Sequence, residues 1–429
     1  MIHQTGLASA IGWVDFSSEH REKVKSVIDL LSTPGVIDEL GIGVIRDSFS
    51  DSLFPGISTI QTRAKYFLIV PRIFKDFEKL PAHKRRRRKL ADFLNEQENQ
   101  CMEAMVANHQ DDGQDGIIGE SFADKQGEVQ RKPSSVYWTG IRQFGLIQTN
   151  LSLQVFCRKF ANPDQPLQDL VQGSDKTKGD DPDAAEQANE TINGPSFEDD
   201  WIENLTVYLT HEEASFLSRQ IEARVPLSLL GQILLDSEVR QKFLALPNEW
   251  NFTTLADEAP FLGRFPDELQ RIIAAARDFW QLMKGAHIRY NCVLQARRGT
   301  SELRKEFEAM WTVWVQELHS FPWDRWETGF LWQLAKRHHR RVRSNTVTFV
   351  ESWINHVQSG ADADKLDRLV TRQEQCNKGT RARLDPRADV TERKWVGIDD
   401  LNYRLNVART IIRDIDTGLK ASEDSDAGC

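Results

Sequence analysis

An unbroken run of cations is the stretch of this sequence best suited to holding a charged partner. Residues 83–90 read HKRRRRKL, and the run comprises Lys84, Arg85, Arg86, Arg87, Arg88 and Lys89. Pro81 suits the first turn of a helix, and a helix continuing through Leu94 would put the cations at its positive end, each unfavourable by up to ~1 kcal/mol. Cations at a position that the helix dipole disfavours indicate a polyanionic partner, such as a phosphate backbone. The alternative is a hydrated run that keeps a loop soluble.

A second candidate surface follows the turn in LFPGISTIQTRAKYFLIVP, residues 53–71. Ser58 and a glutamine three residues later match a capping box, which predicts a helix from Thr59. On the wheel of that helix the polar face would carry Gln61, Lys65 and Arg72, although Pro71 would kink or interrupt it. Because 36–54 also has a helical pattern, the segment is compatible with a helix-turn-helix and equally with any pair of antiparallel helices.

A third cluster of cations lies in AKRHHRRVR, residues 335–343, where we single out Arg340, Arg341 and Arg343. Three tryptophans precede it, at positions 323, 326 and 332. Aromatic and basic side chains together bind single strands by stacking and charge. Trp323, Trp326 and Phe330 also lie at helical spacing, and such a stripe is typical of a packed core.

Charge is distributed unevenly along a chain of 429 residues with a formal net charge of -9. Residues 60–90 hold 11 Lys/Arg against 2 acids, and residues 162–200 hold 11 acids against 2 Lys. Such asymmetry can attract a polyanion to one region of an acidic protein. The hydrophobic content of 40% is ordinary for a soluble globular protein.

Signatures of known enzyme chemistry are missing from the sequence. It contains no GxGxxG, Walker A, GxSxG or HExxH motif, and its 5 cysteines form no CxxC pair. We therefore predict no catalytic residue, no metal and no cofactor. One alternative remains, a metal-dependent nuclease with an unrecognised site, because Asp385 and Asp389 precede Glu392-x-Lys394.

The pattern of apolar residues predicts a mainly α protein made of two helical regions separated by an acidic disordered linker. The expected parts are an N-terminal region 1–161, the linker 162–200, a Trp-rich region 201–420 and an acidic tail 421–429. A small helix-turn-helix or winged-helix-like part could lie in the first region. Helical stripes occur at 18–32, 89–106, 133–147, 211–223, 266–283, 301–318, 346–357 and 399–419.

Finer predictions concern two of these segments and the compartment. We expect the last helix to be capped by Asp399 or Asp400 and stopped by Gly418. Residues 152–156, SLQVF, are the best candidate for a strand. The widely spaced cysteines, the lack of a signal-peptide pattern and the lack of a long apolar run favour the cytoplasm.

Four segments together resemble a known bacterial family. They are IGWVDFS, ELGIGVIRDSFSDSLFPGISTIQTRAKYFLIVP, KPSSVYWTGIRQFGLI and KWVGIDDLNYRLNVARTIIRDI, and they look like the family catalogued as domain of unknown function 6361. The likeness spans most of the chain outside the acidic segment. It implies no catalytic or binding residues. By association it implies partners such as a helicase or nuclease subunit encoded nearby, in a phage-defence setting.

These observations lead to one functional hypothesis and two alternatives. We expect a cytoplasmic, non-catalytic component of a nucleic-acid-directed bacterial system, with DNA or RNA backbone as partner and no membrane. The first alternative is a protein–protein assembly subunit without nucleic-acid contact. The second is the nuclease described above. The main hypothesis requires the three sets of cations to be exposed and to share a surface.

Overall fold

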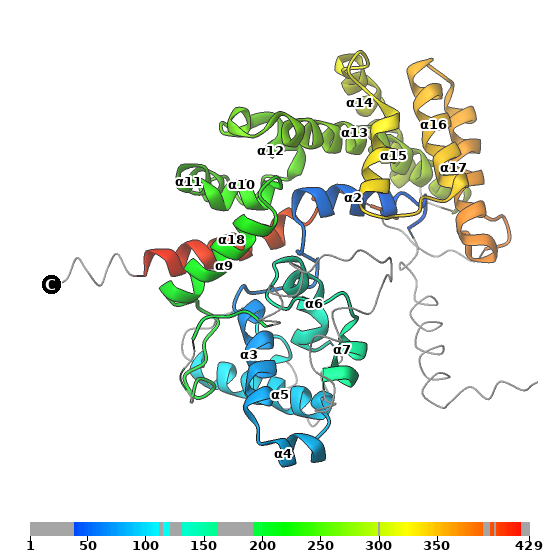
Figure 1. Ribbon diagram of the computed structural model, residues 1–429. Helices are drawn as coiled ribbons and strands as arrows, with labels where there is room; N and C mark the ends of the chain where they lie inside the picture. The colour runs from blue at the N-terminus through cyan, green and yellow to red at the C-terminus, as the bar shows by residue number, and fades with distance from the viewer. Residues whose placement is uncertain are drawn as a thin grey trace, which may run out of the picture. The chain divides into compact units, whose positions relative to one another are not determined.

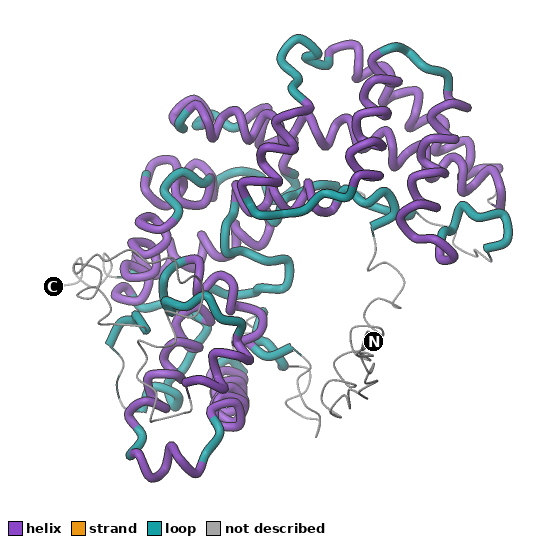
Figure 2. Tube along the Cα trace, turned by 45° about the vertical axis from the view of Figure 1, so that its right-hand side comes forward, coloured by secondary structure: helices purple, strands orange, loops and turns teal. Residues whose placement is uncertain are grey.

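The computed structural model describes residues 38–110, 115–120, 131–160, 192–196, 198, 200–298, 301–388, 395–398 and 400–421. These residues form 16 α-helices and three short 3-10 helices, η3 Leu262–Arg264, η4 Leu318–Ser320 and η5 Gly379–Arg381. Figure 2 shows them joined by loops. Between the described residues the only β-type pairing is an isolated antiparallel bridge of Ile147 with Ile192. The prediction of a mainly α protein is confirmed.

The chain divides into two compact units, each built from separate stretches. Unit 1 comprises 1–43, 282–323 and 342–399, and unit 2 comprises 44–281, 324–341 and 400–429. Helix α13, Asp267–Arg298, contributes its first part to unit 2 and the remainder to unit 1. The predicted division at 162–200 stays a prediction, because most of that segment lies outside the described residues, as does the acidic tail.

One part of unit 2 is a cluster of helices around an aromatic core (Figure 1). Its helices are α3 Tyr66–Lys79, α4 Ala82–Arg87, α5 Leu90–Asn108, α6 Pro133–Gln143 and α7 Leu153–Phe160. The Phe67 ring centroid lies 4.8 Å from that of Tyr137, edge to face, and Phe74 lies 5.4 Å from Phe156. Such geometries are favoured by the ring quadrupoles in addition to the area they bury. These rings belong to α3, α6 and α7, so the aromatic core joins the three helices.

The other part of unit 2 contains α18, Leu405–Lys420, and further helices. They are α2 Gly43–Leu53, α9 His211–Arg224, α10 Leu229–Leu235, α11 Ser237–Leu244, α12 Phe252–Glu258 and α15 Thr328–Arg337. A capping box starts α9, since the Thr210 side chain accepts from the Glu213 N–H and the Glu213 side chain accepts from the Thr210 N–H. Helix α9 packs closely against α18.

Unit 1 packs three helices on the second part of α13. They are α14 Ser301–Glu317, α16 Ser344–Gln358 and α17 Ala363–Lys378. Trp353 is buried and its Nε1 donates to the Leu282 carbonyl at 2.9 Å. The buried Glu374 accepts from the Tyr290 hydroxyl at 2.7 Å and from the Leu384 N–H at 2.8 Å. These polar groups are satisfied, as burial requires.

Most of the helices predicted from apolar periodicity are confirmed. Helices α5, α9, α14 and α16 begin and end within two residues of the predicted bounds, and α6 is followed by Gly145 with φ of 68°. The helix expected at 18–32 lies outside the described residues. The strand expected at 152–156 is wrong, because residues 153–156 belong to α7, whose Phe156 packs into the aromatic core. Tertiary packing overrides a weak strand propensity here.

The predicted ends of the last helix are also wrong. Helix α18 begins at Leu405 after Arg404, and it continues through Gly418 to Lys420. A Cβ atom on Gly418 would lie 2.7 Å from the Ala214 Cβ and 3.0 Å from the Leu209 Cβ. The glycine therefore permits close approach to α9 and does not stop the helix.

Candidate functional site

Residues 84–87 are helical and residues 88–89 are extended. This corrects the prediction that the cations lie at the positive end of a helix. Lys84 to Arg87 lie in the last turn of α4, while Arg88 and Lys89 are extended and precede α5. Figure 1 shows α4 as a short separate helix beside α3 and α5. The first four cations thus occupy the negative end of α4, where positive charge is favourable. Unfavourable placement on a helix dipole is no longer a reason to infer a polyanionic partner for them.

For contact with a partner, the relevant property of these six cations is how far each is exposed. Lys84, Arg86, Arg87 and Lys89 are exposed, and Arg85 and Arg88 are half-buried. Arg88 forms an ion pair with Glu96, and its guanidinium lies 4.7 Å from the Phe93 ring centroid. The six side chains therefore divide into four that are exposed and two that are half-buried.

Gln61 belongs to a buried turn, not to an exposed helical face. Only 4% of it is exposed, whereas the neighbouring Ile60 is 42% exposed. Its Oε1 accepts from the Ser58 N–H at 3.1 Å and its Nε2 donates to the Gly56 carbonyl at 3.0 Å. The Ser58–Gln61 pattern thus closes a local turn, and the next helix begins only at Tyr66. The predicted helix start at Thr59 is wrong.

Lys65 and Arg72 are buried as well, so the predicted polar surface of this helix is wrong. The Lys65 Nζ lies 2.7 and 2.6 Å from the two carboxylate oxygens of Glu213, and both side chains are nearly inaccessible. Arg72 is 5% exposed and pairs with Asp76, one turn later in α3, at 3.1 Å. Helix α3 runs through Pro71 without interruption. Buried cations with bonded carboxylates are compensated within the fold.

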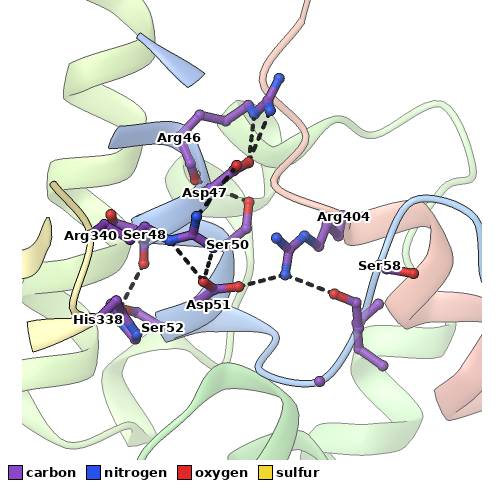
Figure 3. A network of polar contacts seen from close by, with 12 residues as sticks. Arg46, Asp47, Ser48, Ser50, Asp51, Ser52, Ser58, His338, Arg340 and Arg404 are labelled. Atoms are coloured by element: carbon purple, nitrogen blue, oxygen red, sulfur yellow. Dashed lines mark hydrogen bonds and ion pairs between the residues drawn. The ribbon is translucent and has the colours of Figure 1, made fainter. Parts of the chain in front are cut away.

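Arg340 is held in a polar network at α2 (Figure 3). Asp51 accepts from the Nε of Arg340 at 3.1 Å and from Nη1 of Arg404 at 2.8 Å, and Nη2 of Arg340 forms a further short contact with the same carboxylate. Arg404 also donates to the Ile57 carbonyl at 2.7 Å, and its backbone is left-handed with φ of 72°. This network connects α2 to the ends of α15 and α18. The charge of Arg340 is compensated by Asp51 within unit 2.

The same network brings a serine and a histidine together, which the sequence did not signal. The Ser52 Oγ lies 2.6 Å from the His338 Nε2 (Figure 3), and it also donates to the Ser48 carbonyl at 3.0 Å. Burial lowers the pKa of His338, with Asp51 acting in the opposite direction. The Ser52 hydroxyl thus lies within hydrogen-bond distance of both the Ser48 carbonyl and the His338 ring, and the contact with His338 links α2 to the residue that follows α15.

Arg341 and Arg343 are both exposed, but they belong to different units. Arg343 precedes the first residue of α16, and its Nη1 lies 3.5 Å from the Asn377 Oδ1. Whether these two arginines share a surface with the run at 84–89 stays a prediction.

A pocket of about 420 Å³ in unit 2 adjoins the aromatic stretch that precedes these arginines. Its charged and aromatic lining comprises Arg271, Asp278, Arg325, Trp326, Glu327 and Phe330. Arg271 lies 4.3 Å from the Phe330 ring centroid and 2.7 Å from Glu327, and Arg325 lies 3.6 Å from the buried Asp278. Its arginines face carboxylates of their own unit. This arrangement resembles packing more than a basic groove for single strands.

The part of the chain with assigned positions offers no group of three or more His, Cys, Asp or Glu side chains able to hold a metal ion. Asp385 pairs with Arg387 at 3.3 Å, and Glu392 and Lys394 of the alternative nuclease site lie outside that part. None of the helices among the described residues is long and apolar enough to cross a membrane.

The fold and these contacts define a mainly α protein with an exposed basic stretch and several buried, internally compensated ion pairs. Residues 8–418 match the model of a family of unknown function, DUF6361, and the chain belongs to that family. Comparison with curated proteins and with solved structures found no match.

Proposed function

We propose that this protein is a non-catalytic component of a nucleic-acid-directed system and that it binds the phosphate backbone through residues 84–89, the basic stretch. One observation carries the proposal: Lys84, Arg86, Arg87 and Lys89 are exposed within six consecutive residues. Closely spaced cations on a surface release counterions from a nucleic acid when they contact its phosphates. The net charge of -9 makes such a local concentration necessary for binding.

The proposed interface is smaller than the one predicted from sequence. Gln61, Lys65, Arg72 and Arg340 are excluded from it, because their polar groups bond within the fold. A helix-turn-helix or winged-helix part is not required, since backbone contacts carry no sequence information. The proposal therefore predicts binding that depends on salt and is indifferent to base sequence.

A salt titration of oligonucleotide binding tests the proposal. We would measure the affinity for a labelled duplex by fluorescence anisotropy, for the wild type and for Arg87→Gln/Lys89→Gln. The matched control is Lys365→Gln/Arg368→Gln, which removes two exposed cations from α17 and causes the same change in net charge. Each phosphate contact contributes roughly 0.9 to the slope of log affinity against log salt.

The expected result is a shallower slope for Arg87→Gln/Lys89→Gln, by about 1.8, with little change in the control. Equal effects of the two variants would show attraction by net charge alone and would refute the basic stretch as the interface. Absence of binding at low salt would remove the nucleic-acid proposal. The assembly subunit, with an acidic protein as partner, would then be the better hypothesis.

A further inference from the structure

Arg409 on α18 is a buried arginine whose hydrogen bonding is incomplete. It is 5% exposed, its Nη1 donates to the Pro247 carbonyl at 3.0 Å, and its guanidinium carbon lies 5.7 Å from the Phe243 ring centroid. Its Nε and Nη2 are buried and have no hydrogen-bond partner among the residues whose positions are described. Buried polar atoms without partners are rare in native proteins and call for an unseen water, ion or ligand.

The two unpaired nitrogens are a chemically specific pair. Nε and Nη2 form one edge of the guanidinium, and their N–H bonds point in the same direction, matching the two oxygens of a carboxylate or phosphate. The buried Arg289 and the half-buried Arg63 show this edge filled. Arg289 donates from Nε and Nη2 to the two oxygens of Asp367, both at 2.7 Å, and Arg63 holds both oxygens of Asp414 at 3.0 Å.

The surroundings of Arg409 favour an anion, and no carboxylate of the described residues contacts its Nε or Nη2. Burial lowers the pKa of Arg409, and the next cation along α18, Arg413, lowers it further, while Glu249 acts in the opposite direction. Arg413 and Glu249 are both exposed. The loop between α11 and α12 contributes Pro247 and Glu249, so the guanidinium lies just beneath surface residues. An uncompensated buried cation is costly, and an oxyanion bound to it would remove much of that cost.

We propose that the Nε/Nη2 edge of Arg409 binds an oxyanion with two coplanar oxygens, a carboxylate or a phosphate, and that Arg413 adds a second positive charge. The site lies on α18 and does not depend on the basic stretch 84–89. Its ligand is a small anion or the acidic group of a larger molecule. Glu249 carries the same charge as the ligand and weakens its binding.

Thermal unfolding with different anions tests this site. The wild type would be melted with added sodium phosphate, acetate or chloride at equal ionic strength. We expect phosphate or acetate to raise the unfolding midpoint above that in chloride, by about 2 °C at ten times the dissociation constant. A shift with phosphate alone identifies a phosphate site, and a shift with acetate alone identifies a carboxylate site.

Two variants separate this site from general anion effects. Arg409→Lys keeps a positive charge but lacks the paired edge, so the anion-dependent shift should disappear, while the exposed Arg368→Lys should respond like the wild type. Identical shifts in the wild type and in Arg409→Lys would overturn the proposal, as would the absence of any shift in the wild type.

Glu249→Gln gives a second, direct measurement, because it changes an exposed residue and leaves Arg409 in place. Titration calorimetry with inorganic phosphate or acetate, whichever anion raises the midpoint, should give tighter binding in Glu249→Gln than in the wild type, by roughly 2- to 5-fold at low salt for one exposed charge. If only Glu249→Gln bound the anion, the carboxylate of Glu249 itself would be the occupant of the edge, and the proposal would fail.

Discussion

Replacing Lys65 with Met tests whether this cation is a buried partner of Glu213 or part of a binding surface. The side chains of Lys65 and Glu213 are 7% and 6% exposed, and the carboxylate also accepts from the Thr210 N–H at 2.8 Å. Met has a similar length and no charge, so the substitution leaves Glu213 buried without its counterion. The position should therefore matter for stability and not for nucleic-acid binding.

The expected loss follows from the environment of the pair. Breaking a buried ion pair by removing one partner costs about 3–5 kcal/mol, because a buried charge is left uncompensated. An exposed pair contributes only about 0–1 kcal/mol. Lys242 and Glu238, which are 42% and 54% exposed with the atoms 2.6 Å apart, provide the matched control on α11. We expect Lys65→Met to destabilise several-fold more than Lys242→Met.

A double-mutant cycle assigns the loss to the pair. Urea unfolding followed by circular dichroism would be measured for Lys65→Met, Glu213→Gln and the double variant. Gln at 213 retains an acceptor for the Thr210 N–H, so the helix cap is preserved. The double variant should lose less stability than the sum of the single losses, by roughly 1–3 kcal/mol.

Two results would refute the reasoning. One is a loss for Lys65→Met no larger than that for Lys242→Met. The other is a weaker affinity of folded Lys65→Met for an oligonucleotide together with unchanged stability, which would place Lys65 on the binding surface after all. Additive losses in the double variant would also argue against a direct interaction.

Three further outcomes follow from the contacts. Gly418→Ala should lose about 1–3 kcal/mol in thermal melting because its Cβ would overlap α9, whereas Gly329→Ala, with no atom within 4 Å of the added Cβ, should be neutral or stabilising. Burial raises the pKa of Glu98 to about 7 from an ordinary 4.5. The contribution of Glu98 to the free energy of unfolding is therefore complete below pH 4.5 and is lost as the pH rises to about 7. The loss amounts to up to about 1.4 kcal/mol per pH unit. Glu98→Gln should flatten the urea-unfolding stability profile over this range, and parallel profiles would contradict that origin. Asp51→Asn should lower the melting temperature more than Asp385→Asn, since Asp51 holds two arginines and Asp385 one fully exposed arginine.

The sequence by itself determined the helices with a clear amphipathic period, but it did not predict α10, α11, α12, α15 or α17. Amphipathic periodicity and capping residues are local, and they set α5, α9, α14 and α16 almost to the residue. The same rules failed where a distant element intervened. Gly418 lies inside α18, where its missing side chain leaves room for α9, and the Ser58–Gln61 pattern closes a turn that is not continued as a helix. A local signal cannot report the element that later packs against it.

The tertiary structure decided which cations are exposed and which are buried. Lys65 is separated from Glu213 by 148 residues and Arg340 from Asp51 by 289, so neither pairing has a local signature. By contrast, six adjacent cations in 84–89 cannot all be buried, because each would need a carboxylate of its own, and four of them are exposed. The density of charge in a short stretch can thus be judged from sequence, whereas the burial of a single cation depends on what the fold places beside it.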